Sequence, residues 1–121
     1  MLAVIFEVVP QAGERKTYLE IAERLSHELD RVDGFVSIER FESLSIPGKI
    51  LSLSFWRDEE AVRQWRNLEE HRHAQIRGRH GVFADYRLRV AAVMRDYGLK
   101  DRAEVPSDSA AIHDQYFTEP K

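Results

Sequence analysis

The segment Ser43–Trp65, SLSIPGKILSLSFWRDEEAVRQW, specifies the centre of the fold of this 121-residue chain. Within it, residues 49–56 are predicted to form a strand after the turn at Pro47–Gly48. Successive strand side chains point to opposite faces, so one face carries Leu51, Leu53 and Phe55 and the other carries Ile50, Ser52, Ser54 and Trp56. Asp58 is a favourable N-cap, so a helix is expected to follow and to run through Trp65 to about Arg66.

The sequence on either side supplies the other elements. Before residues 49–56, the predicted elements are a strand Leu2–Val9, a helix Glu14–Arg31 and a strand Phe35–Ser43. After the helix that begins at Asp58, they are a short helix His71–Arg77 and a last strand Tyr86–Tyr97. Apolar residues recur at i, i+3 and i+4 in the first helix, and Gly78 is expected to end the short one. The order β-α-β-β-α-β predicts an α+β, ferredoxin-like fold with an antiparallel sheet over residues 1–97.

The predicted helices cover only one face of this sheet. The other face also carries apolar side chains, and in a chain of this length its natural partner is the same face of a second copy. We therefore expect a homodimer through the sheet face, a dimeric α+β barrel. Residues 98–121 are predicted to form an irregular C-terminal tail in which Tyr116 and Phe117 anchor it to the partner subunit.

Charge and composition exclude several classes of protein. Residues 57–95 carry nine arginines, no lysine and six acidic residues, whereas the segments before and after them are net negative. This arrangement favours ion pairs within the fold or between subunits over nucleic-acid binding. No apolar run approaches the ~20 residues of a membrane span. The chain has no cysteine, which excludes thiolate chemistry and is typical of a cytoplasmic protein.

These features resemble a known family. The element order, the segment SFWRDEEAVRQW (residues 54–65), the following HRHAQ (residues 71–75) and the arginine-bearing last strand are similar to the antibiotic biosynthesis monooxygenase (ABM) family. The likeness covers about residues 2–97 and implies a small dimeric α+β barrel. Members include cofactor-free monooxygenases that oxidise hydroxyaromatics to quinones, haem-degrading monooxygenases and proteins of no assigned activity.

The haem-degrading branch fits this sequence poorly. Its members resemble one another in an Asn on the first strand, a Trp in the second helix and a His ten residues beyond that Trp. Trp65 matches, but Gln75 stands where the His is expected, and the first strand offers Phe6 and Glu7 instead of Asn. Because an amide is a poor iron ligand beside imidazole, haem degradation requires His71 or His73 to substitute.

The resemblance therefore favours oxidation of a small aromatic or quinol-like molecule by O₂, without metal, flavin or haem. Its implied catalytic residues are His71, as proton acceptor or donor, and Trp65, as an aromatic wall. His71 has the alternative of an exposed or capping residue, and Trp65 that of a core residue. A non-enzymatic small-ligand-binding module of the stress-response kind remains the alternative for the whole chain.

Five further residues are candidates for substrate binding. Trp56, Ser52 and Ser54 share one strand face, whose mixed character is typical of either a pocket lining or a core. Glu7 interrupts an apolar strand and is expected either to pair with an arginine or to contact substrate as a general base. Arg89, on the less apolar face of the last strand, is expected either to pair with Glu7, Glu39 or Glu42 or to contact substrate. No metal site is expected, since a His-x-His pair on a helix points its two rings apart.

Overall fold

The computed structural model describes residues 1–117, without the side chains of residues 69, 70 and 113–117. Its elements are β1 (Leu2–Pro10), α1 (Arg15–Ser26), the 3₁₀ turn η1 (Leu29–Arg31), β2 (Phe35–Glu42), β3 (Ile50–Trp56), α2 (Glu59–Asn67), α3 (Glu69–Arg77), the π-helical segment η2 (Gly78–Val82), β4 (Phe83–Ala92) and α4 (Ser107–Phe117). Among these residues, no helix has the length and apolarity needed to cross a bilayer.

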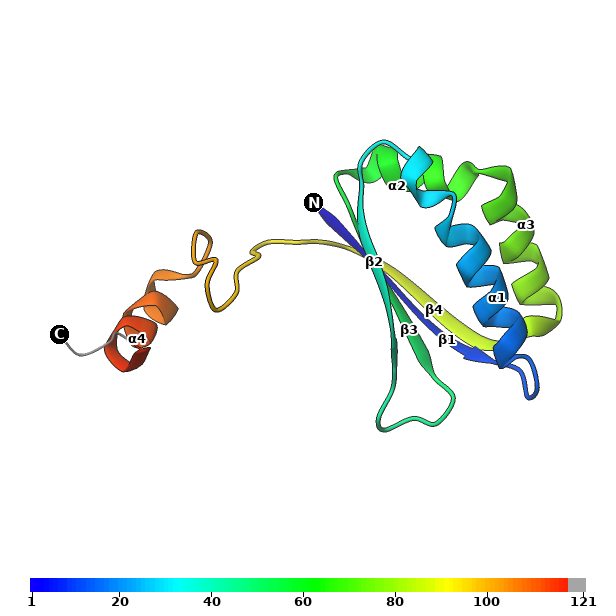
Figure 1. The fold of residues 1–121 in the computed structure, drawn as a ribbon, viewed down its shortest axis with the longest axis horizontal. Helices are drawn as coiled ribbons and strands as arrows, with labels where there is room; N and C mark the ends of the chain where they lie inside the picture. Colours follow the sequence, from blue (N-terminus) through cyan, green and yellow to red (C-terminus); the bar gives the residue numbers. More distant parts are fainter. Residues whose placement is uncertain (118–121) are drawn as a thin grey trace.

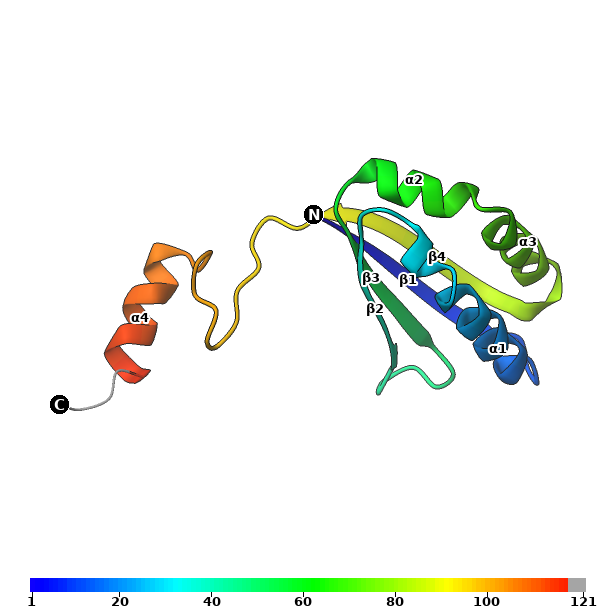
Figure 2. The same ribbon diagram turned by 45° about the horizontal axis from the view of Figure 1, so that its top comes forward.

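The four strands form one antiparallel sheet in the order β2-β3-β1-β4. Figures 1 and 2 show α1, α2 and α3 together on one face of this sheet, with the other face uncovered. The predicted α+β, ferredoxin-like β-α-β-β-α-β architecture is therefore confirmed. As expected, Asp58 caps α2, because its Oδ1 accepts a hydrogen bond of 2.9 Å from the backbone N–H of Ala61.

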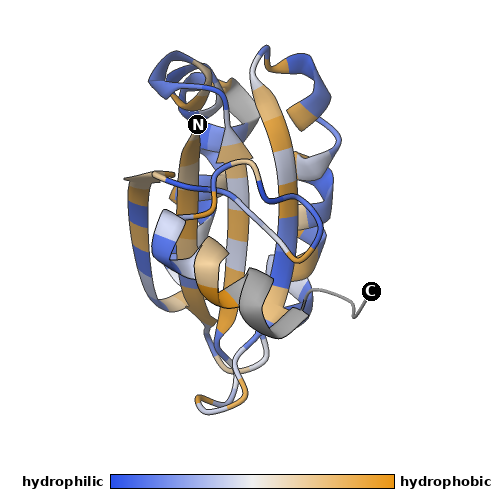
Figure 3. Ribbon diagram, turned by 90° about the vertical axis from the view of Figure 1, so that its left-hand side faces the viewer, coloured by the Kyte–Doolittle hydropathy of each residue, from blue (hydrophilic) through white to orange (hydrophobic). Residues whose placement is uncertain are grey.

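Strand alternation assigns the two faces as predicted. The face of β3 toward the helices carries the buried residues Ile50, Ser52, Ser54 and Trp56. Pairing with β1 aligns Val4 with Ser54 and Phe6 with Ser52, so these β1 side chains share that face. The bands of hydrophobic and hydrophilic residues along the strands are visible in Figure 3.

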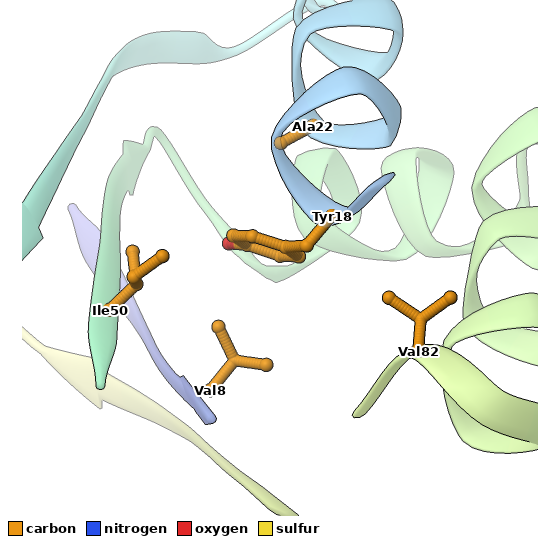
Figure 4. Close-up of a cluster of buried hydrophobic side chains, with 5 residues drawn as sticks. All are labelled: Val8, Tyr18, Ala22, Ile50 and Val82. Carbon is orange, nitrogen blue, oxygen red and sulfur yellow. The ribbon is translucent and has the colours of Figure 1, made fainter. Parts of the chain in front are cut away.

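Two apolar clusters fill the space between helices and sheet. One centres on the fully buried Trp56, beneath η1 and α2. The other joins Val8, Tyr18, Ala22, Ile50 and Val82. In Figure 4 the ring of Tyr18 extends from α1 into the space between that helix and the strands. Because the two clusters lie at opposite ends of β1 and β3, the middle of this interface is left for a pocket.

Three element boundaries differ from the prediction by three residues or more. The first helix ends at Ser26, whose Oγ bonds back to the carbonyl of Ala22 at 2.9 Å, and the chain resumes only as the short turn η1. The last strand begins three residues earlier than predicted and ends at Ala92, because its ladder follows β1 from Pro10 back to Leu2.

The C-terminal tail is only partly irregular. Residues 93–106 lack regular structure, but Ser107–Phe117 form α4 where no helix was predicted. Figures 1 and 2 show this segment extending away from the body of the sheet and helices. The side chains of Tyr116 and Phe117, predicted to anchor the tail, lie outside the described residues.

Candidate functional site

A cavity of about 210 Å³ lies between the sheet and the helices. Its floor is formed by helix-facing side chains of β1 and β3, among them Val4, Phe6, Ser52 and Ser54. Its roof comes from α1, α2 and α3. Ligand pockets usually measure about 300–1,000 Å³, so this one suits a small molecule.

The two predicted catalytic residues meet in this pocket. Trp65 of α2 and His71 of α3 both line it, and their ring centroids are 4.7 Å apart at an interplanar angle of 58°. The α2–α3 break at Leu68 positions this contact, because its extended backbone (φ −63°, ψ 137°) turns α3 away from the axis of α2. The structure thus gives His71 an aromatic neighbour within the cavity.

His71 is electrically neutral at pH 7. Burial, reinforced by the positive charges of Arg72 and Arg66, lowers its pKa from 6.5 to about 4. Its Nδ1 is buried and has no hydrogen-bond partner among the residues that the structure describes. A neutral imidazole with a free ring nitrogen can accept a proton from a bound molecule or hydrogen-bond to it.

The predicted binding residues on β3 separate into two groups. Ser52 and Ser54 line the pocket, as their strand face implies. Trp56 shares that face but is 0% exposed, lies outside the pocket lining and packs in the core. Its indole Nε1–H donates to Ser54 Oγ at 2.9 Å, and its ring stacks on Trp65 at 6.1 Å. Trp56 therefore supports the pocket wall from behind.

Glu7 and Arg89 lie on the opposite face of the sheet, away from this pocket. Arg89 Nη1 is 3.4 Å from Glu7 Oε2, and Lys49 Nζ approaches the same oxygen at 3.3 Å. The hydrogen bond from Lys49 is the largest cause of a lowered Glu7 pKa, which Arg89 lowers further. The expected pairing of Glu7 with an arginine is confirmed, and neither residue contacts the cavity described above.

The sequence-based list missed several polar and aromatic residues of the pocket. Arg40 of β2 and Tyr18 of α1 both line it, and burial raises the pKa of Tyr18 while the Arg40 cation opposes that rise. The sequence feature that could have identified Arg40 as a pocket residue is its position two residues after Ile38, which puts both side chains on one face of the strand. A register shift between Phe35 and Ser37 had obscured which face that was.

The pocket opens along the edge strand β4. Tyr86 and Leu88 line it and are nevertheless 44% and 47% exposed, because the helices do not extend over this edge. Phe83, also in the lining, packs so tightly on Gly78 that a Cβ there would lie 2.4 Å from its ring. Gly78 thus lets η2 approach β4 and closes the pocket at the start of that strand.

The pocket residues do not fit a haem group or a bound metal ion. Gln75, which lines the pocket, supplies an amide where the resemblance to haem-degrading enzymes requires imidazole, and Phe6 stands on the strand where they have Asn. Among the described residues, no three His, Cys, Asp or Glu side chains gather closely enough to hold a metal ion.

Comparison with known sequences agrees with this architecture. The model of the family "Antibiotic biosynthesis monooxygenase" matches residues 1–77. Jasmonate monooxygenase ABM of Pyricularia oryzae is 54% identical over 93 residues, which are 77% of this chain and 43% of the fungal protein. This chain therefore aligns with less than half of that relative. Uncharacterized protein YqjZ of Bacillus subtilis is 32% identical over 93 residues, 77% of this chain and 79% of the bacterial one.

A solved structure shares the fold. Rv0793 of Mycobacterium tuberculosis superposes with a TM-score of 0.71 over 80% of this chain and 98% of its own, at 16% identity. At that identity the likeness supports the fold alone. The family model and the two sequence relatives carry the assignment further: this chain belongs to the antibiotic biosynthesis monooxygenase family.

Proposed function

We propose that this protein is a monooxygenase that oxidises a small aromatic or quinol-like molecule with O₂, without metal, flavin or haem. The observation that carries the proposal is the neutral, buried His71 in contact with Trp65 inside an apolar cavity. Such a site can take a proton from an acidic phenol or C–H group, hold the resulting anion against an aromatic wall and limit the access of water.

The reaction balances without an external reductant. After His71 accepts a proton, the substrate carbanion supplies the electrons that reduce O₂, and a bond forms between the substrate carbon and one oxygen atom. Loss of water from the resulting peroxide converts a CH₂ group into C=O, so that CH₂ + O₂ gives C=O + H₂O. Ser52 and Ser54 are placed to hydrogen-bond the substrate oxygen, and Trp65 to stack on its ring.

The name of the fungal relative raises a second substrate, jasmonate. Hydroxylation of an unactivated C–H group in such a molecule consumes two electrons that neither the substrate nor the pocket side chains supply. Jasmonate is therefore tested with and without an added reductant. Turnover that depends on the reductant would contradict the self-reducing reaction proposed above.

The direct test is oxygen consumption by the purified protein in the presence of a metal chelator. The substrates are small hydroquinones and hydroxyanthrones, each compared with its uncatalysed rate. We expect uptake above that rate in the wild type, and its loss in His71→Ala and Trp65→Phe. Arg63→Gln, on the exposed side of α2 and outside the pocket lining, is the control that should keep full activity. Uptake that survives His71→Ala would contradict the role given to this residue.

The two alternatives give different results in the same samples. Tight ligand binding without oxygen uptake would indicate a binding module. A Soret band in the purified protein, or a saturable Soret band on titration with haem, would favour the hypothesis that the protein binds or degrades haem, although Gln75 stands where a histidine ligand is expected. Neither result depends on whether the protein is a monomer or a dimer.

We also propose that the open sheet face pairs with the same face of a second copy to form the dimeric α+β barrel. Phe41 on this face is 42% exposed, beside the part-exposed Leu51, Leu53 and Phe55 of β3. Three apolar side chains of the extended tail, Met94, Leu99 and Ile112, are also exposed in the single chain. Burying them stabilises a dimer. Sedimentation at micromolar concentration should give twice the chain mass, and a monomer would refute the barrel.

A further inference from the structure

The pocket contains a cation that the proposed chemistry does not use. Arg40 reaches it from β2, at the position paired with Ser52 of β3. Its Nη1 lies 3.5 Å from Ser26 Oγ and its Nη2 lies 3.4 Å from the carbonyl oxygen of Ala22. Both distances exceed the usual 2.7–3.2 Å of an N–H···O bond. The guanidinium also interacts with the phenol of Tyr18. Its third donor, Nε, is buried and has no hydrogen-bond partner among the described residues.

No carboxylate within the described part of the chain balances this charge. The pocket lining contains Arg40 and Arg79 but neither Asp nor Glu. Among the ion pairs of the described residues, none includes Arg40. A partly buried guanidinium with loose hydrogen bonds is unfavourable in the empty protein, since transfer of an unpaired charge out of water is costly. The charge therefore indicates a ligand that pairs with it.

We propose that Arg40 binds the anionic head group of the pocket's ligand and that this ligand is a small apolar carboxylate. The inference rests on the proposed function in taking this cavity as the substrate site. A guanidinium binds a carboxylate through two adjacent N–H groups, and the free Nε supplies one of them. Apart from Arg40, the lining contains one further arginine, Arg79, and is otherwise mainly apolar, which suits a singly charged carboxylate better than a phosphate.

The placement of the residues orients such a ligand. Arg40 enters from β2, at one edge of the sheet, and contacts the last turn of α1. Trp65 and His71 come from the α2–α3 side of the same cavity. The carboxylate therefore lies at the β2 edge, and the apolar body extends toward Trp65. Arg40 acts in binding and selection, and His71 in proton transfer.

Isothermal titration at pH 7 tests this with two probes of the same shape, 3-phenylpropanoate and 3-phenylpropanamide. We expect the wild type to bind the acid at least about tenfold more tightly than the amide, as charge-assisted bonds imply. Arg40→Gln should remove that preference and leave binding of the amide unchanged. Arg40→Lys keeps the charge but not the paired donors, so it should give an intermediate preference. Arg63→Gln makes the same charge change on the exposed side of α2, outside the pocket lining, and should behave as the wild type.

Several results would overturn the inference. The wild type could bind the acid and the amide with equal affinity, or it could bind neither probe. Arg40→Gln could also weaken the binding of the acid and of the amide by the same factor. A merely structural role for Arg40 predicts a lower melting temperature for Arg40→Gln, whereas removal of an unbalanced charge predicts an unchanged or higher one. If Arg40→Gln does not fold, the acid-to-amide ratio in Arg40→Lys decides. Acid selectivity without oxygen uptake refutes only the monooxygenase; uptake without selectivity refutes only the role of Arg40.

Discussion

The depressed pKa of His71 makes the stability of the protein depend on pH in a defined window. The group titrates at 6.5 when unfolded and at about 4 when folded. Between these values the unfolded chain binds the proton that the folded chain excludes. Stability is therefore complete above pH 6.5 and is lost as the pH falls toward 4.

The size of the effect follows from the shift. A difference of about 2.5 pKa units corresponds to roughly 3 kcal/mol when fully developed, at about 1.4 kcal/mol per unit. By pH 5 the linkage relation gives a loss of about 2 kcal/mol relative to pH 7. The group is mostly buried, so solvent screens little of this energy.

The loss of stability in acid is measured by urea unfolding of the wild type and of His71→Gln at intervals between pH 7 and pH 4.5. Carboxylates that are paired in the folded state also weaken the protein in acid, but they do so equally in both proteins. The difference between the two curves isolates His71. We expect the variant to become more stable than the wild type, relative to their values at pH 7, by about 2 kcal/mol at pH 5.

Parallel curves for the two proteins would refute the reasoning. So would an NMR titration in which the His71 ring signals move with a midpoint near 6.5 in the folded protein. Either result would show that water reaches the ring, and the neutral, dry imidazole that the proposed chemistry requires would not exist.

Three further predictions test the walls of the pocket and the opposite face. Ser54→Ala leaves the buried Trp56 N–H without its acceptor, so it should lower the free energy of unfolding by about 1–3 kcal/mol in a urea titration. Ser52→Ala should lower it less, and equal losses would contradict the role of the Trp56 hydrogen bond. Gly78→Ala forces the Phe83 ring to move and should cost about 1–3 kcal/mol by overpacking while weakening probe binding, whereas Gly98→Ala, with no atom within 4 Å, should do neither. Glu7→Gln leaves Lys49 and Arg89 without their shared carboxylate on the face that the proposed dimer buries, so it should lower the melting temperature and weaken dimerisation measured by sedimentation. Oxygen uptake should stay unchanged, because the pocket lies on the other side of the sheet; a loss of uptake would place Glu7 in the site.

Local chemistry explains which parts of the fold were predictable. The alternation in β3 and the cap at Asp58 depend on near neighbours in sequence, and both were confirmed. The start of β4 depends on the tight packing of Phe83 against Gly78, which no periodicity shows. The C-terminal helix α4 was not predicted because its apolar residues do not recur with a clear helical period.

The site was predictable only in part, for the same reason. His71, Trp65, Ser52 and Ser54 lie where their helix and strand faces imply, and they line one pocket. Arg40 was missed because the register shift near Phe35 changes which residues of β2 face the helices. The neutrality of His71 was equally hidden, since its burial depends on how α3 packs in three dimensions.

The electrostatics of the pocket connect the two proposals. In the empty protein, positive charges near His71 help to keep it neutral, and Arg40 is left without a counter-ion. A bound carboxylate would neutralise Arg40 and bring negative charge into the same low-dielectric space. Negative charge favours the protonated form of a histidine, so occupancy should raise the pKa of His71. The ligand would then strengthen the base that acts on it, because a proton acceptor with a pKa nearer to neutrality has a larger driving force for taking the proton.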